Sequence, residues 1–348
     1  MIVGAAGRGP ATIAELLDPA LAARLDGLDV LSRKVFAGKL QGERRSKRRG
    51  RSVEFDDYRE YVPGDDLRHI DWNVFARLDR FFIKVFQEEE DLSLHLVIDA
   101  SASMLAGVPT KLLCAARIAV ALGYIGLVKN NRVMVSLIGS SVGPARVLRQ
   151  LAPLRGRSGT QRLATYLVEE LFNQPADEAG AGGAVPGNAF SAACRTIAAG
   201  NAGGKGVLVL LSDLLVPGPG GYQEGLKLLT AGGDGFDVAV LQVLSPGEID
   251  PSMERRGGGG VAATGAGEAG GRSPITGDLR LTDAETGREA EITATPELIE
   301  RYRRSVRKYV DDAATFCVLR GCTHALVPSD TDAGELVLGT LRRRGIVG

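Results

Sequence analysis

The chain has 348 residues, of which 44% are hydrophobic and 24% are charged, and its 42 basic side chains balance its 42 acidic ones. This composition is ordinary for a globular protein with a sizeable core, and it excludes a disordered chain. The zero net charge argues against a protein that coats nucleic acid through a global positive field.

The sequence also argues against a zinc-finger protein, a secreted protein and a membrane protein. The four cysteines form no C-x-x-C pair and have no zinc-finger spacing, so we expect thiols that act as apolar fillers in a reduced compartment. The N-terminus lacks the charged start and apolar block of a signal peptide. The most apolar stretch, Leu112–Val128, falls short of a typical membrane span and contains Arg117, which favours a buried core helix. We therefore expect a cytoplasmic protein without a membrane span.

The first part of the chain differs in pattern from the rest. Leucines recur at helical spacing between residues 11 and 36, which predicts a helical start. The apolar piece Phe81–Phe86 has the pattern of a strand. The pattern changes near residue 91, so we expect an N-terminal segment over residues 1–90 and a larger domain over residues 91–348.

Short apolar strands alternate with helices from residue 92 onward. The predicted strands are Leu94–Ile98, Arg132–Ile138, Ala145–Leu151, Val207–Leu211, Phe236–Val243 and His324–Val327. The predicted helices are Lys111–Lys129, Gly159–Phe172, Phe190–Ala199, Tyr222–Ala231, a long one after Pro296, and Gly334–Arg343. This alternation predicts an α/β fold of Rossmann-like type, with a mostly parallel sheet flanked by helices.

Two glycine-rich loops interrupt this domain, at residues 176–188 and 256–274. Their composition is typical of surface insertions. After the second loop, the segments Asp278–Thr282 and Glu289–Thr293 flank a Glu-Thr-Gly turn, which predicts a β-hairpin.

Oxygen-bearing side chains follow two of the predicted strands. Asp99, Ser101 and Ser103 form an Asp-x-Ser-x-Ser string directly after the first strand of the domain, and Asp213 closes the strand Val207–Leu211. Thr160 stands in a glycine-flanked loop before a helix. Ligands bind at the carboxyl ends of parallel strands, and hard oxygens suit Mg²⁺ or Mn²⁺. We therefore predict a site for one of these ions at these five residues.

This pattern resembles the metal-ion-dependent adhesion site of the von Willebrand factor A fold, in which Asp-x-Ser-x-Ser is followed by a loop threonine and a strand-end aspartate. A longer resemblance lies upstream, carried by Gly50–Phe55, Arg59–Trp72 and Ala76-Arg77. These residues are similar to the signature of a prokaryotic family catalogued as domain of unknown function 58. Further likeness at Leu244–Glu248 and Asp283–Gly287 extends the match to about residues 15–345.

The family resemblance implies a function as well as a fold. Members carry a von Willebrand factor A-type domain that accompanies MoxR-type AAA+ ATPases, with a role in the assembly or maturation of protein complexes. For this chain it implies a non-enzymatic, metal-dependent binding module. Its partner would be such an ATPase or the client of that ATPase, held through an acidic residue on the metal.

Two other functions stay open on the residues alone. A phosphohydrolase of haloacid-dehalogenase type would use Asp99 as nucleophile, but Ser101 stands where its general acid belongs. A nucleic-acid-binding adaptor would use the basic run 44–51, but the acidic residues that follow and the absence of interleaved aromatics favour a solvated arm. The single tryptophan, Trp72, is expected to anchor the N-terminal segment in a core.

Overall fold

The computed structural model describes residues 10, 13–32, 54–62, 70–87, 92–139, 147–173, 189–201, 204–218, 220–231, 236–251, 277–282 and 289–348. The chain divides into two compact units. The larger unit contains Met1–Ala37 and Leu92–Gly348, and the smaller unit contains Gly38–Asp91. The change of pattern near residue 91 therefore coincides with a unit boundary, while the first 37 residues group with the larger unit.

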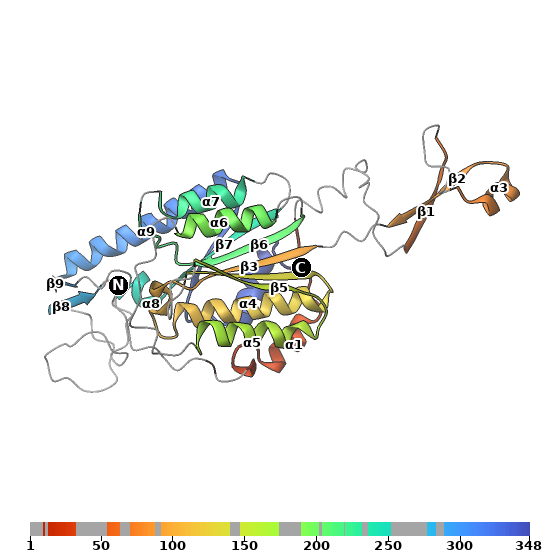
Figure 1. Ribbon diagram of the computed structural model, residues 1–348. Coiled ribbons are helices and arrows are strands. Elements are labelled where there is room, and N and C mark those ends of the chain that lie inside the picture. Colours follow the sequence, from red (N-terminus) through yellow and green to blue (C-terminus); the bar gives the residue numbers. More distant parts are fainter. Residues whose placement is uncertain are drawn as a thin grey trace. The chain divides into compact units, whose positions relative to one another are not determined.

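Six strands form the central sheet of the larger unit, in the spatial order β10-β7-β6-β3-β4-β5, and Figure 1 labels β7, β6, β3 and β5 among them. In chain order they are β3 (Ser93–Asp99), β4 (Arg132–Ile138), β5 (Leu148–Leu154), β6 (Gly206–Ser212), β7 (Phe236–Leu244) and β10 (Thr323–Pro328). Every neighbouring pair is parallel except β4 and β5. The predicted α/β fold with a mostly parallel sheet is confirmed.

The strand order reverses direction next to β3. The chain leaves β3 for its neighbour β4 on one side, and the later strand β6 pairs with β3 on the other side. The carboxyl ends of β3 and β6 therefore border the point at which open α/β sheets bind their ligands.

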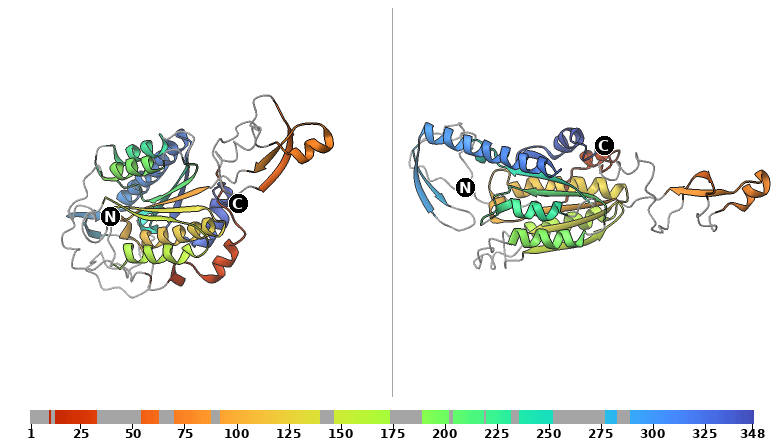
Figure 2. Two further views of the ribbon diagram at one scale, coloured as in Figure 1. Left: turned by 45° about the vertical axis from the view of Figure 1, so that its right-hand side comes forward. Right: turned by 90° about the horizontal axis from the view of Figure 1, so that it is seen from above.

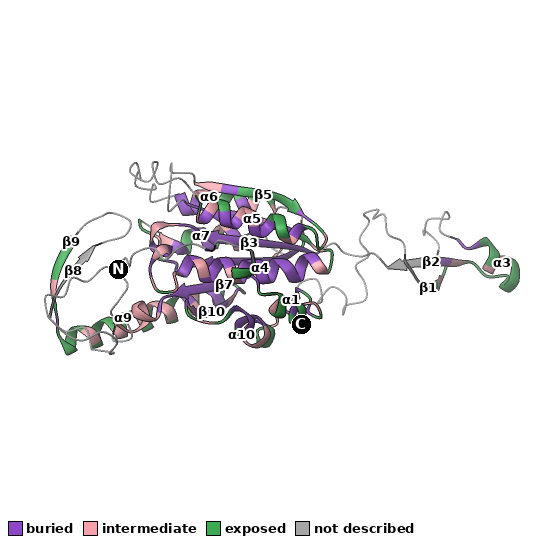
Figure 3. Ribbon diagram, turned by 90° about the horizontal axis from the view of Figure 1, so that it is seen from below, coloured by how far each residue is buried: buried purple, intermediate pink, exposed green. Residues whose placement is uncertain are grey.

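Helices cover both faces of the sheet, as two further views show (Figure 2). The helices α4 (Lys111–Val128) and α5 (Gly159–Leu171) pack on one face, and α6 (Ala189–Gly200), α7 (Gly221–Thr230) and α9 (Pro296–Leu319) on the other. The strands alternate between the two cores: Leu96 and Ile98 belong to the first cluster and Val97 to the second. Burial on both faces explains why these strands are almost entirely apolar (Figure 3).

The helix α4 lies at the centre of this unit. It is the one helix among the described residues that is long and apolar enough to cross a membrane, yet 83% of that stretch is buried inside the protein. This burial is what the sequence predicts for a core helix. The four cysteines are buried and form no disulfide with one another, as expected of apolar fillers.

The N-terminal helical region is shorter than its leucine pattern predicts. Only Ile13–Glu15 and α1 (Pro19–Leu25) are helical between residues 13 and 32. Asp18 lies between these two helical pieces and caps the N-terminus of α1, where its side chain accepts a hydrogen bond from the backbone N–H of Ala20 at 3.1 Å. The leucines still serve the core, since Leu16, Leu17 and Leu25 belong to the first cluster.

The smaller unit contains a two-stranded antiparallel sheet and one helix. Its strands are β1 (Glu54–Glu60) and β2 (Phe82–Gln87), and its helix is α3 (Trp72–Leu78). Phe75 stacks on Phe81 with ring centroids 4.4 Å apart, and Trp72 contacts both rings edge-on. Trp72 is nevertheless 61% exposed, so the expectation of a buried anchor is wrong. In the described part of this unit the aromatic cluster lies at the surface.

The C-terminal part matches its predicted elements. The hairpin forms from β8 (Gly277–Thr282) and β9 (Glu289–Ala294), and the long helix after Pro296 is α9. The last predicted helix appears as α10 (Ala333–Glu335), followed by a π-helical stretch over Leu336–Leu341. The glycine-rich loops 176–188 and 256–274 and the basic run 44–51 lie outside the described residues.

Candidate functional site

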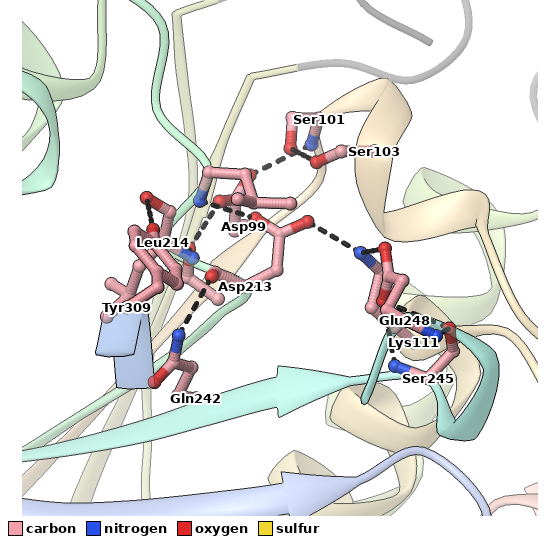
Figure 4. A network of polar contacts seen from close by, with 12 residues as sticks. Asp99, Ser101, Ser103, Lys111, Asp213, Leu214, Gln242, Ser245, Glu248 and Tyr309 are labelled. Atoms are coloured by element: carbon pink, nitrogen blue, oxygen red, sulfur yellow. Dashed lines mark hydrogen bonds and ion pairs between the residues drawn. The ribbon is translucent and has the colours of Figure 1, made fainter. Parts of the chain in front are cut away.

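The candidate site lies where β3 and β6 end side by side. Asp99 is the last residue of β3, and Asp213 directly follows the last residue of β6. The pairing of Ile98 with Leu211 brings these two strand ends together. Both aspartates are almost fully buried, with 5% and 1% of their surface exposed. The structure therefore brings together the two carboxylates that the sequence predicts for one site (Figure 4).

Two hydrogen bonds hold the Asp99 carboxylate. The backbone N–H of Ser101 donates to Oδ1 at 3.0 Å, and the hydroxyl of Ser212 donates to Oδ2 at 2.6 Å. Burial and, next, the negative charge of Asp213 raise the pKa of Asp99 from its usual value to about 6. The two hydrogen bonds oppose this rise without cancelling it. Among the residues that the structure describes, no basic side chain forms an ion pair with Asp99.

The two serines of the Asp-x-Ser-x-Ser string also meet in the structure. The Oγ atoms of Ser101 and Ser103 lie 3.1 Å apart in a hydrogen bond (Figure 4). They flank the start of η3 (Ala102–Leu105), a short 3-10 helix that follows β3. Ser103 is fully buried and Ser101 is half-buried. The string therefore places two hydroxyl oxygens beside the Asp99 carboxylate on one turn.

A buried lysine occupies the other side of Asp213. The ammonium of Lys111, the first residue of α4, donates to Oδ2 of Asp213 at 2.7 Å and to Oε1 of Glu248 at 2.6 Å. Lys111 has no exposed surface. Burial alone would lower its pKa, but the charges of Asp213 and Glu248 outweigh this effect and raise it. Lys111 is therefore a permanent cation at this edge of the sheet.

The backbone after Asp213 has an unusual conformation. Leu214 has a φ of 63°, in the left-handed region that bulky residues rarely adopt. Its N–H donates to the hydroxyl of Ser212 at 2.9 Å, and its carbonyl accepts from the hydroxyl of Tyr309 at 2.6 Å. These bonds hold a strained turn next to the site, a location in which such strain is often found.

Thr160 is not part of this site, and its assignment is corrected. Because β5 runs antiparallel to β4, the chain returns to the amino edge of the sheet before α5 begins. A Cβ on the preceding Gly159 would contact Leu127, near the end of α4. Thr160 therefore lies at the edge opposite Asp99. Its hydroxyl oxygen is buried there without a hydrogen-bond partner.

Sequence reasoning missed Ser212, Lys111 and Glu248. Ser212 stands beside Asp213 in the chain, and its position at the end of a buried strand was an available signal. Lys111 was also visible as a charge at the start of an apolar helix. Its partners are 102 and 137 residues away, so no local pattern could identify them.

The chemistry of the described site depends on few groups. Among the residues that the structure describes, no cluster of three or more His, Cys, Asp or Glu side chains is arranged to hold a metal. The edge instead presents three carboxylates, from Asp99, Asp213 and Glu248, against the one ammonium of Lys111. Its formal charge is therefore −2 when all four groups are ionised.

Comparisons with known proteins agree with the likeness in the sequence. A family model described as "Protein of unknown function DUF58" matches residues 57–250. The uncharacterized proteins Mb1516 of Mycobacterium bovis and Rv1480 of Mycobacterium tuberculosis are each 28% identical over 336 residues, which cover 94% of this chain and 92% of theirs.

A solved structure of the pilus adhesin SpaC from Lactobacillus rhamnosus GG matches 75% of this chain at 13% identity, with a TM-score of 0.30. This chain spans 31% of that adhesin's length, and the likeness is too low to support an argument. The family match, in contrast, covers more than half of the chain and includes both Asp99 and Asp213. The chain belongs to the prokaryotic family of proteins of unknown function DUF58.

Proposed function

We propose that this chain is a non-enzymatic, metal-dependent protein-binding module built on a von Willebrand factor A-type domain. The observation that carries the proposal is the uncompensated negative charge at the carboxyl edge of β3 and β6. Three buried or partly buried carboxylates face one ammonium, and a divalent cation would balance the remaining charge. Burial is the main cause of the raised pKa of Asp99, and the negative charge of Asp213 adds to it.

The donor set fits Mg²⁺ or Mn²⁺. Asp99, Ser101 and Ser103 present one carboxylate and two hydroxyl oxygens on a single turn, and both ions prefer oxygen ligands. Asp213 supplies charge from the neighbouring strand end. A bound ion would retain positions for water or for an acidic side chain of a partner.

The resemblance to the family supports a choice of partner. We propose a prokaryotic cytoplasmic adaptor that works with a MoxR-type AAA+ ATPase, or with the client of that ATPase, in the assembly or maturation of protein complexes. On this account the metal completes the surface that the partner binds.

Calorimetric titration of the full chain with MnCl₂ and MgCl₂ tests the metal site. We expect binding by the wild-type chain and loss of binding in Asp99→Asn. Asp237→Asn is the matched control, because Asp237 is also a buried aspartate that accepts a hydroxyl hydrogen bond, from Ser32 at 2.7 Å, but it lies at the amino end of β7. Equal binding by the Asp99 variant would contradict the proposal.

A pull-down from a cell extract of the source organism, with and without EDTA, tests the partner. We expect an AAA+ ATPase to be recovered by the wild-type chain with Mg²⁺ and lost with EDTA or with Asp99→Asn. Hydrolysis of a generic phosphate ester that is lost in Asp99→Asn would instead favour a phosphohydrolase.

A further inference from the structure

Lys111 links the candidate site to a surface helix. Its ammonium bridges Asp213 and Glu248, and Glu248 belongs to α8 (Pro246–Ile249), a short helix after β7. The second oxygen of Glu248, Oε2, accepts from the backbone N–H of Ser245 at 2.8 Å and from its hydroxyl at 3.0 Å. The position of Glu248 is therefore set by the start of α8 as well as by Lys111.

The helix α9 holds this short segment from outside. The hydroxyl of Tyr302 donates to the backbone carbonyl of Glu248 at 2.9 Å, and the guanidinium of Arg303 donates twice to Asp250, at 2.9 and 2.7 Å. Tyr302 is 40% exposed. Two hydrogen bonds thus connect Tyr302, at the surface of α9, to the ammonium that pairs with Asp213: one from Tyr302 to Glu248 and one from Lys111 to Glu248.

The same helix contacts the other side of the site. Tyr309 donates to the carbonyl of Leu214, the strained residue after Asp213. Tyr302 and Tyr309 are seven residues apart, which places them two turns apart on one face of α9. This face therefore holds the Asp213 turn through Tyr309 and the Lys111 anchor through Tyr302.

We propose that Lys111 is a positioning residue that competes with the metal for Asp213, and that α9 sets the strength of this competition through Glu248. The inference rests on the proposed metal site and adds its regulation. A cation bound beside Asp99 must share the charge of Asp213 with the Lys111 ammonium. Anything that loosens Glu248 leaves the Lys111 ammonium paired with Asp213 alone, which strengthens the competition and weakens metal binding. By thermodynamic linkage, metal binding changes the affinity of a partner for α9 by the same factor.

Titration of the full chain with MnCl₂, followed by calorimetry, tests this coupling. For Lys111→Met we expect about tenfold tighter binding, because a positive charge is removed from beside a ligand group. A residue with a purely structural role would give weaker or unchanged binding. Arg157→Met is the control, since the guanidinium of Arg157 pairs with Asp26 and lies just before α5, at the edge of the sheet opposite Asp213. We expect its metal affinity to stay unchanged.

Tyr302→Phe tests the proposed coupling from α9 through Glu248 to Lys111. It alters no charge, and it does not depend on whether the Lys111 variant folds. It removes one hydroxyl at a partly exposed position and loosens Glu248, and we expect about threefold weaker Mn²⁺ binding, the equivalent of part of one hydrogen bond. Ser305→Ala on the same helix is the control, because its exposed hydroxyl donates to the carbonyl of Arg301 within α9.

The outcomes separate the two proposals. If the wild-type chain binds Mn²⁺ but Lys111→Met binds it no more tightly and Tyr302→Phe no more weakly, the coupling is refuted and the metal site stands. If Lys111→Met does not fold, the Tyr302→Phe affinity decides alone. If the wild-type chain binds no Mn²⁺, the proposed function fails and the coupling fails with it.

Discussion

Ser212 and Asp99 tie the two central strand ends together. The hydroxyl of Ser212, at the end of β6, donates to Oδ2 of Asp99, at the end of β3, over 2.6 Å. The Oγ atom of Ser212 also accepts a hydrogen bond from the N–H of Leu214. One buried hydroxyl therefore supports a carboxylate of the site and the strained turn beside it.

Ser212→Ala is expected to destabilise the protein by about 2 kcal/mol, because it leaves a buried carboxylate oxygen and a backbone N–H without this partner. Urea unfolding followed by circular dichroism measures the change. Ser305→Ala, on the exposed surface of α9, is the control and should have little effect. A Ser212→Ala variant as stable as the control would show that this hydrogen bond contributes nothing.

A buried histidine makes stability depend on pH. His95, in β3, contacts Asn201 through Nδ1 and the hydroxyl of Ser136 through Nε2 at 2.8 Å. Burial lowers the pKa of His95 from 6.5 to about 4, against a smaller opposing effect of Asn201. Between these two values the unfolded chain binds more protons than the folded one, so stability falls as the pH drops through this window.

The expected loss from His95 reaches about 3 kcal/mol at pH 4 relative to pH 7. Unfolding free energies of the wild type and His95→Gln, measured from pH 7 to pH 4, check this. The difference between the two proteins should shrink as the pH falls. A constant difference across the range would mean that His95 does not titrate as its burial requires.

Close backbone approach at the start of β6 requires a glycine. A Cβ on Gly206 would lie 1.8 Å from the carbonyl oxygen of Ser93 in the paired strand β3. Gly206→Ala is therefore expected to cost several kcal/mol or to prevent folding. Gly200→Ala is the control, because nothing lies within 4 Å of its added Cβ, and as a helical position it should be neutral or slightly stabilising. Thermal unfolding of both variants provides the comparison.

The single tryptophan reports on the smaller unit alone. Since Trp72 is 61% exposed, its fluorescence should have the red-shifted maximum of a solvated indole and should be quenched efficiently by acrylamide. Free N-acetyltryptophanamide sets the upper limit for quenching. A blue-shifted, poorly quenched emission would show that the aromatic cluster of α3 and β2 is covered in solution.

The predictable part of the site comes from strand ends. Asp99 and Asp213 each follow an apolar run, and in a parallel sheet such positions share one edge. Thr160 was misassigned because the direction of the edge strand β5 decides whether the next helix begins at the carboxyl or the amino edge of the sheet. The apolar pattern of Leu148–Leu154 is the same for both directions, so the sequence does not reveal which one the strand takes. The Lys111–Glu248 pair depends on three-dimensional packing that no local spacing encodes.

The fold was predictable to a similar degree. Buried parallel strands and long amphipathic helices such as α9 have strong periodic patterns. The strand β1, in contrast, is an acidic stretch without an apolar pattern, and its partner β2 follows only after a connection that contains α3. The N-terminal leucines predicted one continuous helix, but the structure has two short helical pieces there. Leucines can pack into the core from short turns as well as from a long helix, so their spacing does not distinguish the two.

The way the smaller unit joins the chain has a consequence for the connectivity of the larger unit. The larger unit is interrupted after residue 37 and resumes at Leu92, so the smaller unit is an insertion in a sheet domain. The described ends of the larger unit both lie at the amino edge of the sheet: Ser32 bonds to Asp237 at the start of β7, and Leu92 precedes β3. Strands β7 and β3 are two strand spacings apart, or about 10 Å, a gap that a short peptide spans. A short peptide in place of the smaller unit would therefore be long enough to connect the two ends of the larger unit without altering any strand of the sheet.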